Sequence, residues 1–531
     1  MYLMAKSLSN ASTYAKTDSV SALDRTILYL TVSLTGASVM VLELLGTRLI
    51  GPFYGVSLYV WSSLISVTMI ALALGYWLGG MIADRVPRLR LSYLIASAAV
   101  STLLIPISIR PVLLLTDPMG LRAGAFLSAL LLFTVPLTLL AMTGPYVIKL
   151  AARQLANVGA LSGSVYAVST LGSVIGTIAL GFYLLPITGA RAVLYGLSAL
   201  LGLLASILAL YERRGSGGNI ATLCVAVIVF ACFGSVALAY EHHRSQPWGK
   251  NLSLLYESES VYGWVRVIDD HAQKVRFMMS DASTISAADL DNVRLGLLSY
   301  QWVTQRLPVF RPGARSALLI GLGGGHIAAG LESQGVKTDA IEIDPSVAYA
   351  ASRYFHYRPS GDLIIGDARY QIRRLNKTYD FIIHDCFTGG SEPAHLMSVE
   401  TLRALKAHLN SGGILAINFV GFTEGERRRP AQLVYRTLGE VFGHRRVYVS
   451  EPNSEFNDFI FFASDAPIAV HPEAASAKTL DLLAEREFFG MTEGETIVTD
   501  DFNPLESLQV SKAEMYRKVL LQRIGLEVLL R

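Results

Sequence analysis

The chain has 531 residues, too many for a single hydrophobic core, so two or three domains are expected. Hydrophobic residues make up 52% of it and charged residues only 16%, whereas soluble domains carry about a quarter charged residues. The net charge of +3 shows no basic excess of the kind that nucleic-acid binding requires, so no nucleic-acid partner is expected. The three cysteines, Cys224, Cys232 and Cys386, have no paired ligand spacing, which predicts neither a disulfide framework nor a metal site.

Residues 1–24 form a polar N-terminal tail, which does not have the pattern of a signal peptide. Charged residues are then scarce between Ile27 and Tyr240, and from Glu241 onward they return to the density of a globular protein. The sequence therefore predicts a transmembrane helical domain at 25–240, which makes the lipid bilayer its first partner. A polar linker at 241–250 follows it.

A membrane-spanning helix needs about 20 predominantly apolar residues. Seven such runs are expected, at 27–47, 57–81, 91–109, 123–147, 161–187, 192–211 and 219–240. Gly172 and Gly176 lie four residues apart, which favours close packing of helices over a transport path. Glu43 lies inside the first run with Arg48 a turn further on, and a structural ion pair and a functional site are equally compatible with them.

Lysine and arginine residues are more numerous in every second connection between the predicted spans. They cluster before the first run and after the second, fourth and sixth: Lys6, Lys16, Arg25, Arg85, Arg88, Arg90, Lys149, Arg153, Arg213 and Arg214. The opposite loops hold Arg48, Arg110, Arg122 and Arg191. The positive-inside rule puts the N-terminus in the cytoplasm, so seven spans would put the C-terminal half outside. The sequence predicts a multi-pass protein of the plasma membrane and leaves the side of its C-terminal half open.

The C-terminal half begins with β-rich segments. Apolar and polar residues alternate over 251–280, which predicts a small antiparallel β-unit. A helix is expected at 288–306, so residues 251–312 are expected to form a small domain. From residue 313 to 531 short apolar runs alternate with helical patterns, which predicts a doubly wound, Rossmann-like α/β domain. Ligands in such sheets bind beyond the carboxyl ends of the strands.

The predicted strand ends carry glycines or acids. The first strand runs into a turn that contains Gly321, Gly323, Gly324 and Gly325. Such a turn lets a ligand approach the backbone. Glu342 ends the second strand, where a carboxylate can accept ribose hydroxyls, with Asp344 just beyond it. Asp367 and Ala368 end the third strand, and Asp385 ends the fourth. Each Asp has an alternative role as a helix N-cap, but the ordered set favours an adenosyl pocket.

These motifs resemble the spermidine synthase family of polyamine aminopropyltransferases, within the class I methyltransferase-like fold. The resemblance covers Glu257 to Val420 and rests on IGLGGG at 320–325, IEIDPSV at 341–347, GDA at 366–368 and HDCF at 384–387. It implies that Glu342 holds the ribose, Asp367 the adenine, and the glycine turn the methionine-derived tail. It also implies that Asp385 is the base that deprotonates an attacking amine. Membrane-spanning versions of the family exist, and TDDFNPLE at 499–506 resembles a motif common in them.

The sequence departs from the family where donor and polyamine are chosen. His326 stands where the family has an Asp that recognises the amine of a decarboxylated donor, and Thr388 replaces a second Asp after the base. The family's Tyr-His-Glu stretch is not intact, and Tyr300 is its nearest counterpart. Candidate acceptor-side residues are Tyr262, Tyr300, Asp500 and Asp501, with a loop cap as the alternative for the two aspartates.

Three functions follow. The leading one is a membrane-anchored aminopropyltransferase that alkylates a small amine or polyamine from decarboxylated S-adenosylmethionine, without a metal. The second is a methyltransferase or other enzyme that uses intact S-adenosylmethionine. The third is a transporter or sensor whose adenosyl-binding domain performs no chemistry. The acceptor is not identified, and a homo-oligomer is left open.

Overall fold

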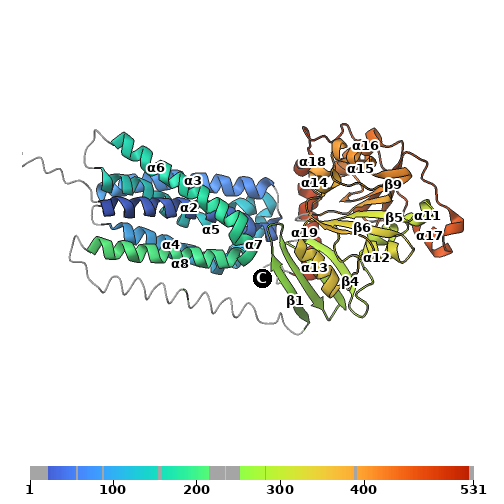
Figure 1. The fold of residues 1–531 in the computed structure, drawn as a ribbon, viewed down its shortest axis with the longest axis horizontal. Helices are drawn as coiled ribbons and strands as arrows, with labels where there is room; N and C mark the ends of the chain where they lie inside the picture. Colours follow the sequence, from blue (N-terminus) through green and yellow to red (C-terminus); the bar gives the residue numbers. More distant parts are fainter. Residues whose placement is uncertain are drawn as a thin grey trace, which may run out of the picture.

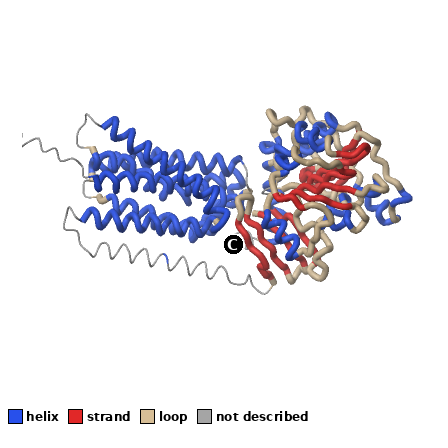
Figure 2. Tube along the Cα trace, in the orientation of Figure 1, coloured by secondary structure: helices blue, strands red, loops and turns tan. Residues whose placement is uncertain are grey.

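The structure is a computed structural model that describes residues 22–55, 58–86, 89–152, 158–213, 234, 251–281, 283–387 and 391–525. Most of the predicted tail, the predicted run at 219–240 apart from Gly234, and the predicted linker lie outside the described residues. The described chain has two parts, an elongated helical bundle and an α/β body at one end of it (Figure 1). Figure 2 shows that the strands are confined to the second part.

The bundle consists of long apolar helices. They are α2 (Ala22–Tyr54), α3 (Leu58–Arg85), α4 (Leu91–Thr116), α5 (Gly120–Ala151), α6 (Val158–Ile178) and α8 (Ala190–Arg213), with short turns η1 (Asp117–Met119), η3 (Ala179–Leu184) and α7 (Leu185–Thr188) between them. Five stretches are long and apolar enough to span a membrane, and the third, Leu91–Ala151, contains both α4 and α5. Contacts between α4 and α5 show that the chain reverses at η1. The first six predicted runs therefore correspond to helices.

Glycines set the closest helix contacts. A Cβ atom on Gly172 would lie 2.1 Å from the carbonyl oxygen of Ser33 on α2, and one on Gly176 would lie 2.9 Å from the Cβ of Ala37. The packing role predicted for this glycine pair is confirmed. The Glu43–Arg48 pair does not form, because the Glu43 carboxyl bonds the Thr68 hydroxyl and Arg48 donates to the carbonyl of Val261 outside the bundle.

A four-stranded antiparallel sheet follows, in the order β1-β2-β3-β4. Its strands are β1 (Leu252–Glu259), β2 (Trp264–Asp270), β3 (Val275–Ser280) and β4 (Ser283–Asp289). The helix predicted at 288–306 is wrong over its first half, because residues up to Asp289 pair with β3 and the helix α10 covers only Ser299–Thr304. A second short helix, α11 (Leu307–Phe310), leads into the larger sheet.

The larger sheet has seven strands in the order β10-β11-β9-β8-β5-β6-β7. They are β5 (Ser316–Ile320), β6 (Lys337–Glu342), β7 (Leu363–Ile365), β8 (Tyr379–His384), β9 (Leu409–Phe422), β10 (His444–Val449) and β11 (Phe456–Ser464). The first five in the chain run parallel, whereas β11 lies antiparallel between β9 and β10. This is the strand order of the class I methyltransferase fold, and the order reverses between β5 and β8, where a ligand crevice is expected.

Helices cover the sheet and form most of the connections between its strands. The chain forms α12 (His326–Glu332), α13 (Pro345–Tyr354), α14 (Ala368–Ile372), η4 (Ala394–Leu396), α15 (Val399–Lys406), η5 (Glu426–Arg428), α16 (Arg429–Val441), η6 (Pro472–Ala474), α17 (Ala477–Arg486), α18 (Leu505–Leu508) and α19 (Val510–Ile524). The last of these lies at the edge of the α/β body that faces the bundle (Figure 1). Arg517 on α19 donates to the carbonyl of Phe53 at 2.9 Å and pairs with Asp117, which ties α19 to the bundle.

Candidate functional site

A cavity of about 890 Å³ lies at the carboxyl ends of the central strands. Residues that follow β5, β6, β7 and β8 line it, and β3, β4, the segment before β11 and α19 close it from other sides. Its size falls within the range of small-molecule and cofactor pockets, which is about 300–1,000 Å³. The topology thus gathers at one place the strand ends that the sequence analysis singled out.

The glycine turn after β5 forms the floor of this cavity. Gly321 and Gly323 line the cavity and have φ angles of 90° and 53°. A Cβ on Gly321 would lie 2.2 Å from the carbonyl oxygen of Asp385, so only glycine fits beneath the end of β8. Gly324 and Gly325 continue the turn into α12, where Gly325 is the residue before the first helical turn.

Glu342 and Asp344 lie together at the end of β6. The Glu342 carboxylate accepts the backbone N–H groups of Leu322 and Asp344, each at 2.9 Å, which fixes it across the cavity floor. Burial raises its pKa, although those two hydrogen bonds act in the opposite direction. Asp344 caps α13 by accepting from the Ser346 N–H at 2.8 Å, and it also accepts from the Ser260 hydroxyl. Both side chains keep free lone pairs for ligand hydroxyl groups.

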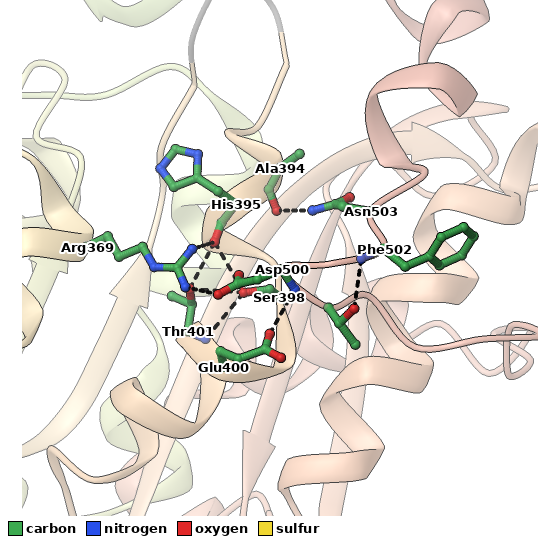
Figure 3. Close-up of polar contacts among 10 residues, drawn as sticks. Arg369, Ala394, His395, Ser398, Glu400, Thr401, Asp500, Phe502 and Asn503 are labelled. Carbon is green, nitrogen blue, oxygen red and sulfur yellow. Dashed lines mark hydrogen bonds and ion pairs between the residues drawn. The ribbon is translucent and has the colours of Figure 1, made fainter.

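Asp367 and Ala368 line the cavity at the end of β7. Asp367 caps α14, accepting from the Tyr370 N–H at 2.8 Å, so the helix-cap alternative also describes part of its role. The next residue, Arg369, pairs with Asp500 and donates to the carbonyl of His395 (Figure 3). His395 also lines the cavity, so Arg369 connects the segment after β7 to a second lining residue.

The 499–506 segment braces the loop after β8. Asn503 donates to the carbonyl of Ala394 at 2.7 Å, and the backbone N–H of Asp500 donates to Glu400 at 3.0 Å (Figure 3). Neither Asp500 nor Asp501 lines the cavity, and Asp501 is exposed. The structure therefore places these two predicted acceptor-side residues behind the wall, with Asp500 supporting it.

Asp385 lines the cavity directly after β8. Its two carboxylate oxygens accept the Tyr300 hydroxyl and the Asn418 side-chain N–H, each at 2.9 Å. Burial raises its pKa to about 6, against the lowering effect of those hydrogen bonds. It is therefore ionised at neutral pH, with a pKa close to the range in which a general base works best. Burial also raises the pKa of the neighbouring Cys386 thiol, which makes that thiol a poor nucleophile.

Other predicted residues divide between the cavity and its surroundings. Tyr262 and Tyr300 line the cavity. His326 does not, because its ring is buried behind the glycine turn, with Nδ1 3.0 Å from the Ser286 hydroxyl and Nε2 3.1 Å from the Val293 carbonyl oxygen. Burial lowers the pKa of His326, so the imidazole is neutral and holds β4 and the following loop against α12.

Asp458 is a cavity residue that the sequence analysis missed. It lies on β11 opposite Val420, and the Ser450 hydroxyl donates to it at 2.9 Å. Burial raises its pKa to about 6, and its charge contributes to the raised pKa of Asp385. The one local signal was a polar pair, Asn457 and Asp458, in an otherwise apolar and aromatic strand.

Charge in the cavity is one-sided. Among the described residues that line it are seven acids: Glu342, Asp344, Asp367, Asp385, Glu451, Glu455 and Asp458. The same set contains a single arginine or lysine, Arg523, which is exposed. The excess of acids means that the cavity suits cationic ligands. No group of three or more His, Cys, Asp or Glu side chains with metal-binding geometry occurs among the described residues.

No family model matches the chain. An N-terminal histidine N-methyltransferase of Emericella nidulans is 29% identical over 251 residues, covering 40% of this chain and 42% of that protein. A polyamine aminopropyltransferase of Vibrio vulnificus is 31% identical over 176 residues, covering 31% of this chain and 59% of that protein. A probable spermidine synthase of Corynebacterium glutamicum has a solved structure with a TM-score of 0.37 and 18% identity, covering 44% of this chain and 86% of that one.

The chain thus spans about half the length of the curated relatives it matches. Its C-terminal part is a spermidine synthase-like domain with the S-adenosylmethionine-dependent methyltransferase fold, preceded by candidate membrane helices.

Proposed function

We propose that the chain is a membrane-anchored transferase that alkylates an amine from a sulfonium donor, with decarboxylated S-adenosylmethionine as the preferred donor. The observation that carries this proposal is Asp385, held by Tyr300 and Asn418 at the end of β8 beside the glycine turn. In the reaction the amine nitrogen attacks a carbon of the sulfonium group. A C–N bond forms, the C–S bond breaks, the thioether leaves, and Asp385 takes the proton from nitrogen.

The charge of the cavity supports the decarboxylated donor. That donor carries a sulfonium and an ammonium group but no carboxylate, and seven acids line the cavity against one exposed arginine. An intact donor would bring a carboxylate into a cavity that offers it few cationic partners, at a cost in desolvation. The adenosyl part would lie on Glu342 and Asp367, which are common to both donors.

A methyltransferase that uses intact S-adenosylmethionine is the second candidate. A specific observation supports it, because the N-methyltransferase relative matches the chain over 251 residues and the Vibrio vulnificus aminopropyltransferase over 176 residues. His326 also fails to supply the acid with which aminopropyltransferases bind the donor amine, since both ring nitrogens bond within the protein. Both candidates keep the same adenosyl residues and the same base.

Calorimetric titration of the full-length chain with each donor separates the candidates. Under the leading proposal decarboxylated S-adenosylmethionine binds at least tenfold more tightly than the intact form. Binding of the intact donor alone would overturn it in favour of the methyltransferase. Glu342→Gln serves as the matched control, because it should weaken both donors to a similar extent.

The helical bundle supports the membrane part of the proposal. Large apolar side chains on its outer surface are exposed, including Leu131 (52%), Leu171 (60%) and Phe182 (77%). An apolar surface of that extent fits a lipid bilayer rather than water. We place the chain in the plasma membrane as a multi-pass protein. A transporter or sensor without chemistry remains the third candidate, and a parent chain that binds a donor but transfers no group to any amine would favour it over the enzyme.

A further inference from the structure

Part of the cavity wall is apolar and continuous with the helical bundle. Six residues both line the cavity and belong to, or pack against, the hydrophobic cluster that contains the bundle core: Val275, Phe277, Ala287, Leu297, Leu298 and Leu520. The same cluster includes Leu45, Phe53 and Leu113 from the membrane helices. The substrate cavity and the membrane part therefore share one apolar layer.

Helix α19 separates the cavity from the bundle by its own thickness only. One face carries Arg517, which contacts Phe53 and Asp117 at the end of the bundle. Its other face carries Met515, Tyr516 and Val519, which line the cavity. An α-helix with its side chains is about 10–12 Å thick, so the cavity lies within about that distance of the ends of the bundle helices. Figure 1 shows α19 at this junction.

The apolar wall reaches the surface of the protein. Gln273 and Arg523 line the cavity and are exposed, and the side chain of Gln273 donates to the carbonyl of Arg523 at 3.1 Å. Val275, Leu297 and Leu298 line the cavity and are partly exposed. An open cavity wall of this kind leaves apolar area in water, and a ligand that covers it gains free energy in proportion to the area.

The acids lie elsewhere in the same cavity. Asp385 accepts hydrogen bonds from Tyr300 and Asn418, and Asp458 is close enough for its charge to raise the pKa of Asp385. Lys512 on α19 is buried and pairs with Glu392, which in turn accepts the backbone N–H of Val420 at the end of β9. The cavity thus offers a cation-binding zone at the reacting centre and an apolar arm that leads from it toward the bundle.

We propose that the acceptor is an amphipathic amine, whose nitrogen lies at Asp385 and Asp458 and whose hydrocarbon chain lies along the apolar arm. Such a molecule resides at the bilayer surface and enters the cavity beside Gln273 and Arg523, at the end of the bundle. This inference rests on the proposed function, since it identifies the class of amine that accepts the alkyl group. It also gives the helical bundle a role, which is to hold the site at the depth where its acceptor resides.

A hydrophilic polyamine is the competing acceptor. It would extend from Asp458 toward the exposed acids Glu451 and Glu455, which line another part of the cavity. A polyamine gains nothing from the apolar arm, because a chain with several ammonium groups loses hydration there. The two acceptors are therefore distinguished by how the rate depends on chain length.

The test uses the full-length chain in lipid nanodiscs, the decarboxylated and intact donors, and primary n-alkylamines from butylamine to dodecylamine, with putrescine and spermidine for comparison. Each added methylene should raise kcat/KM about three- to fourfold until the arm is filled, as expected from the burial of one CH₂ group. Val519→Trp fills the arm and should abolish this dependence while leaving donor affinity within twofold. Lys518→Ala is the matched control, because Lys518 is exposed on the same helix.

Long amines also partition into the lipid, which by itself raises the rate with chain length. Partition is the same for the parent chain and for Val519→Trp, so a difference between the two reports binding in the apolar arm. A chain-length dependence that persists in Val519→Trp would overturn the inference. So would a flat dependence combined with a preference for spermidine, which would leave the proposed function intact. A chain that binds neither donor would overturn the proposed function, and the inference with it.

Discussion

Asp385 carries the chemistry that we propose, and its surroundings allow its role to be separated from donor binding. It touches Tyr300 and Asn418, whereas Glu342 and Asp367, to which we assign the adenosyl part of the donor, lie at the ends of other strands. Asp385→Asn should therefore leave donor affinity within about threefold and lower the single-turnover rate about 10²- to 10⁴-fold, the usual contribution of a general base. An unchanged rate would remove Asp385 as the base.

The pH dependence of the reaction follows from the same residue. The pKa of Asp385 is about 6, so kcat/KM should fall as the pH drops below 6 and the carboxylate takes up a proton. The Tyr300 hydroxyl stabilises the carboxylate, and Tyr300→Phe should move this acid limb to higher pH. An acid limb that stays in place in the variant would show that another group controls it.

The stability of the folded chain should change with pH in the opposite direction to kcat/KM. The pKa of Asp385 is raised from an ordinary value of 3.8 to about 6, so the folded chain binds more protons than the unfolded chain between those two values. The free energy of unfolding therefore decreases as pH rises through this range, and the cost of the buried charge is complete above pH 6. Asp385→Asn should be more stable by about 1 to 2 kcal/mol at pH 7.5, since water in the cavity screens part of the cost, and equal to the parent chain below pH 4. Thermal unfolding at both pH values measures this difference.

At the scale of elements, the 499–506 segment acts as a brace. Asp500 pairs with Arg369 next to Ala368, and Asn503 bonds η4, so the part of the cavity that Ala368 lines depends on contacts from the C-terminal region (Figure 3). Asp500→Ala should weaken donor binding about two- to fivefold, the range expected for a partly exposed ion pair. Asp501→Ala, at the exposed neighbouring position, should leave donor affinity unchanged, and equal losses in both variants would argue against a brace.

The anchoring of α19 rests on a buried ion pair. Lys512 and Glu392 have side-chain exposures of 3% and 0%, and burial lowers the pKa of Lys512. Lys512→Met leaves Glu392 as an uncompensated buried charge and should destabilise the chain by about 3–5 kcal/mol. The double variant Lys512→Met with Glu392→Gln should recover most of that loss in denaturant unfolding. Additive losses would show that the two side chains do not act as a pair.

At the scale of the whole molecule, the structure fixes which end of the bundle carries the α/β body. Arg48 bonds Val261, Asp117 pairs with Arg517, and Ala190 donates to Glu259, so the α2–α3, α4–α5 and α7–α8 connections face that body. The other end carries the more basic connections, including Arg25, Arg85, Arg90, Lys149 and Arg213. This placement does not depend on how many spans lie between residue 213 and the sheet.

The positive-inside rule then predicts that the α/β body faces away from the cytoplasm. A reporter that is active only outside the cytoplasm should be active when it is fused after Arg531. It should be inactive when inserted at Val86, between α3 and α4 at the opposite end of the bundle. A fluorescent cytoplasmic reporter at the C-terminus would contradict this orientation.

The sequence by itself determined the division into an apolar helical half and an α/β half, the first six apolar runs, and the acids and glycines at the ends of β5, β6, β7 and β8. These features are local, because hydrophobic length, strand–helix alternation and strand-end residues are read along the chain. Of the predicted site residues, Gly321, Gly323, Glu342, Asp344, Asp367, Ala368, Asp385, Tyr262 and Tyr300 meet in one cavity.

The tertiary structure alone decided which further residues line the cavity and which predicted residues lie outside it. Asp458 enters the cavity because β11 inserts antiparallel between β9 and β10, a pairing that no local pattern specifies. His326 turns away from the cavity because Ser286 and the carbonyl of Val293, distant in the chain, occupy its ring nitrogens. The apolar arm exists because α19 packs between the bundle and the sheet, so its residues acquire a role only through contacts more than a hundred residues away in sequence.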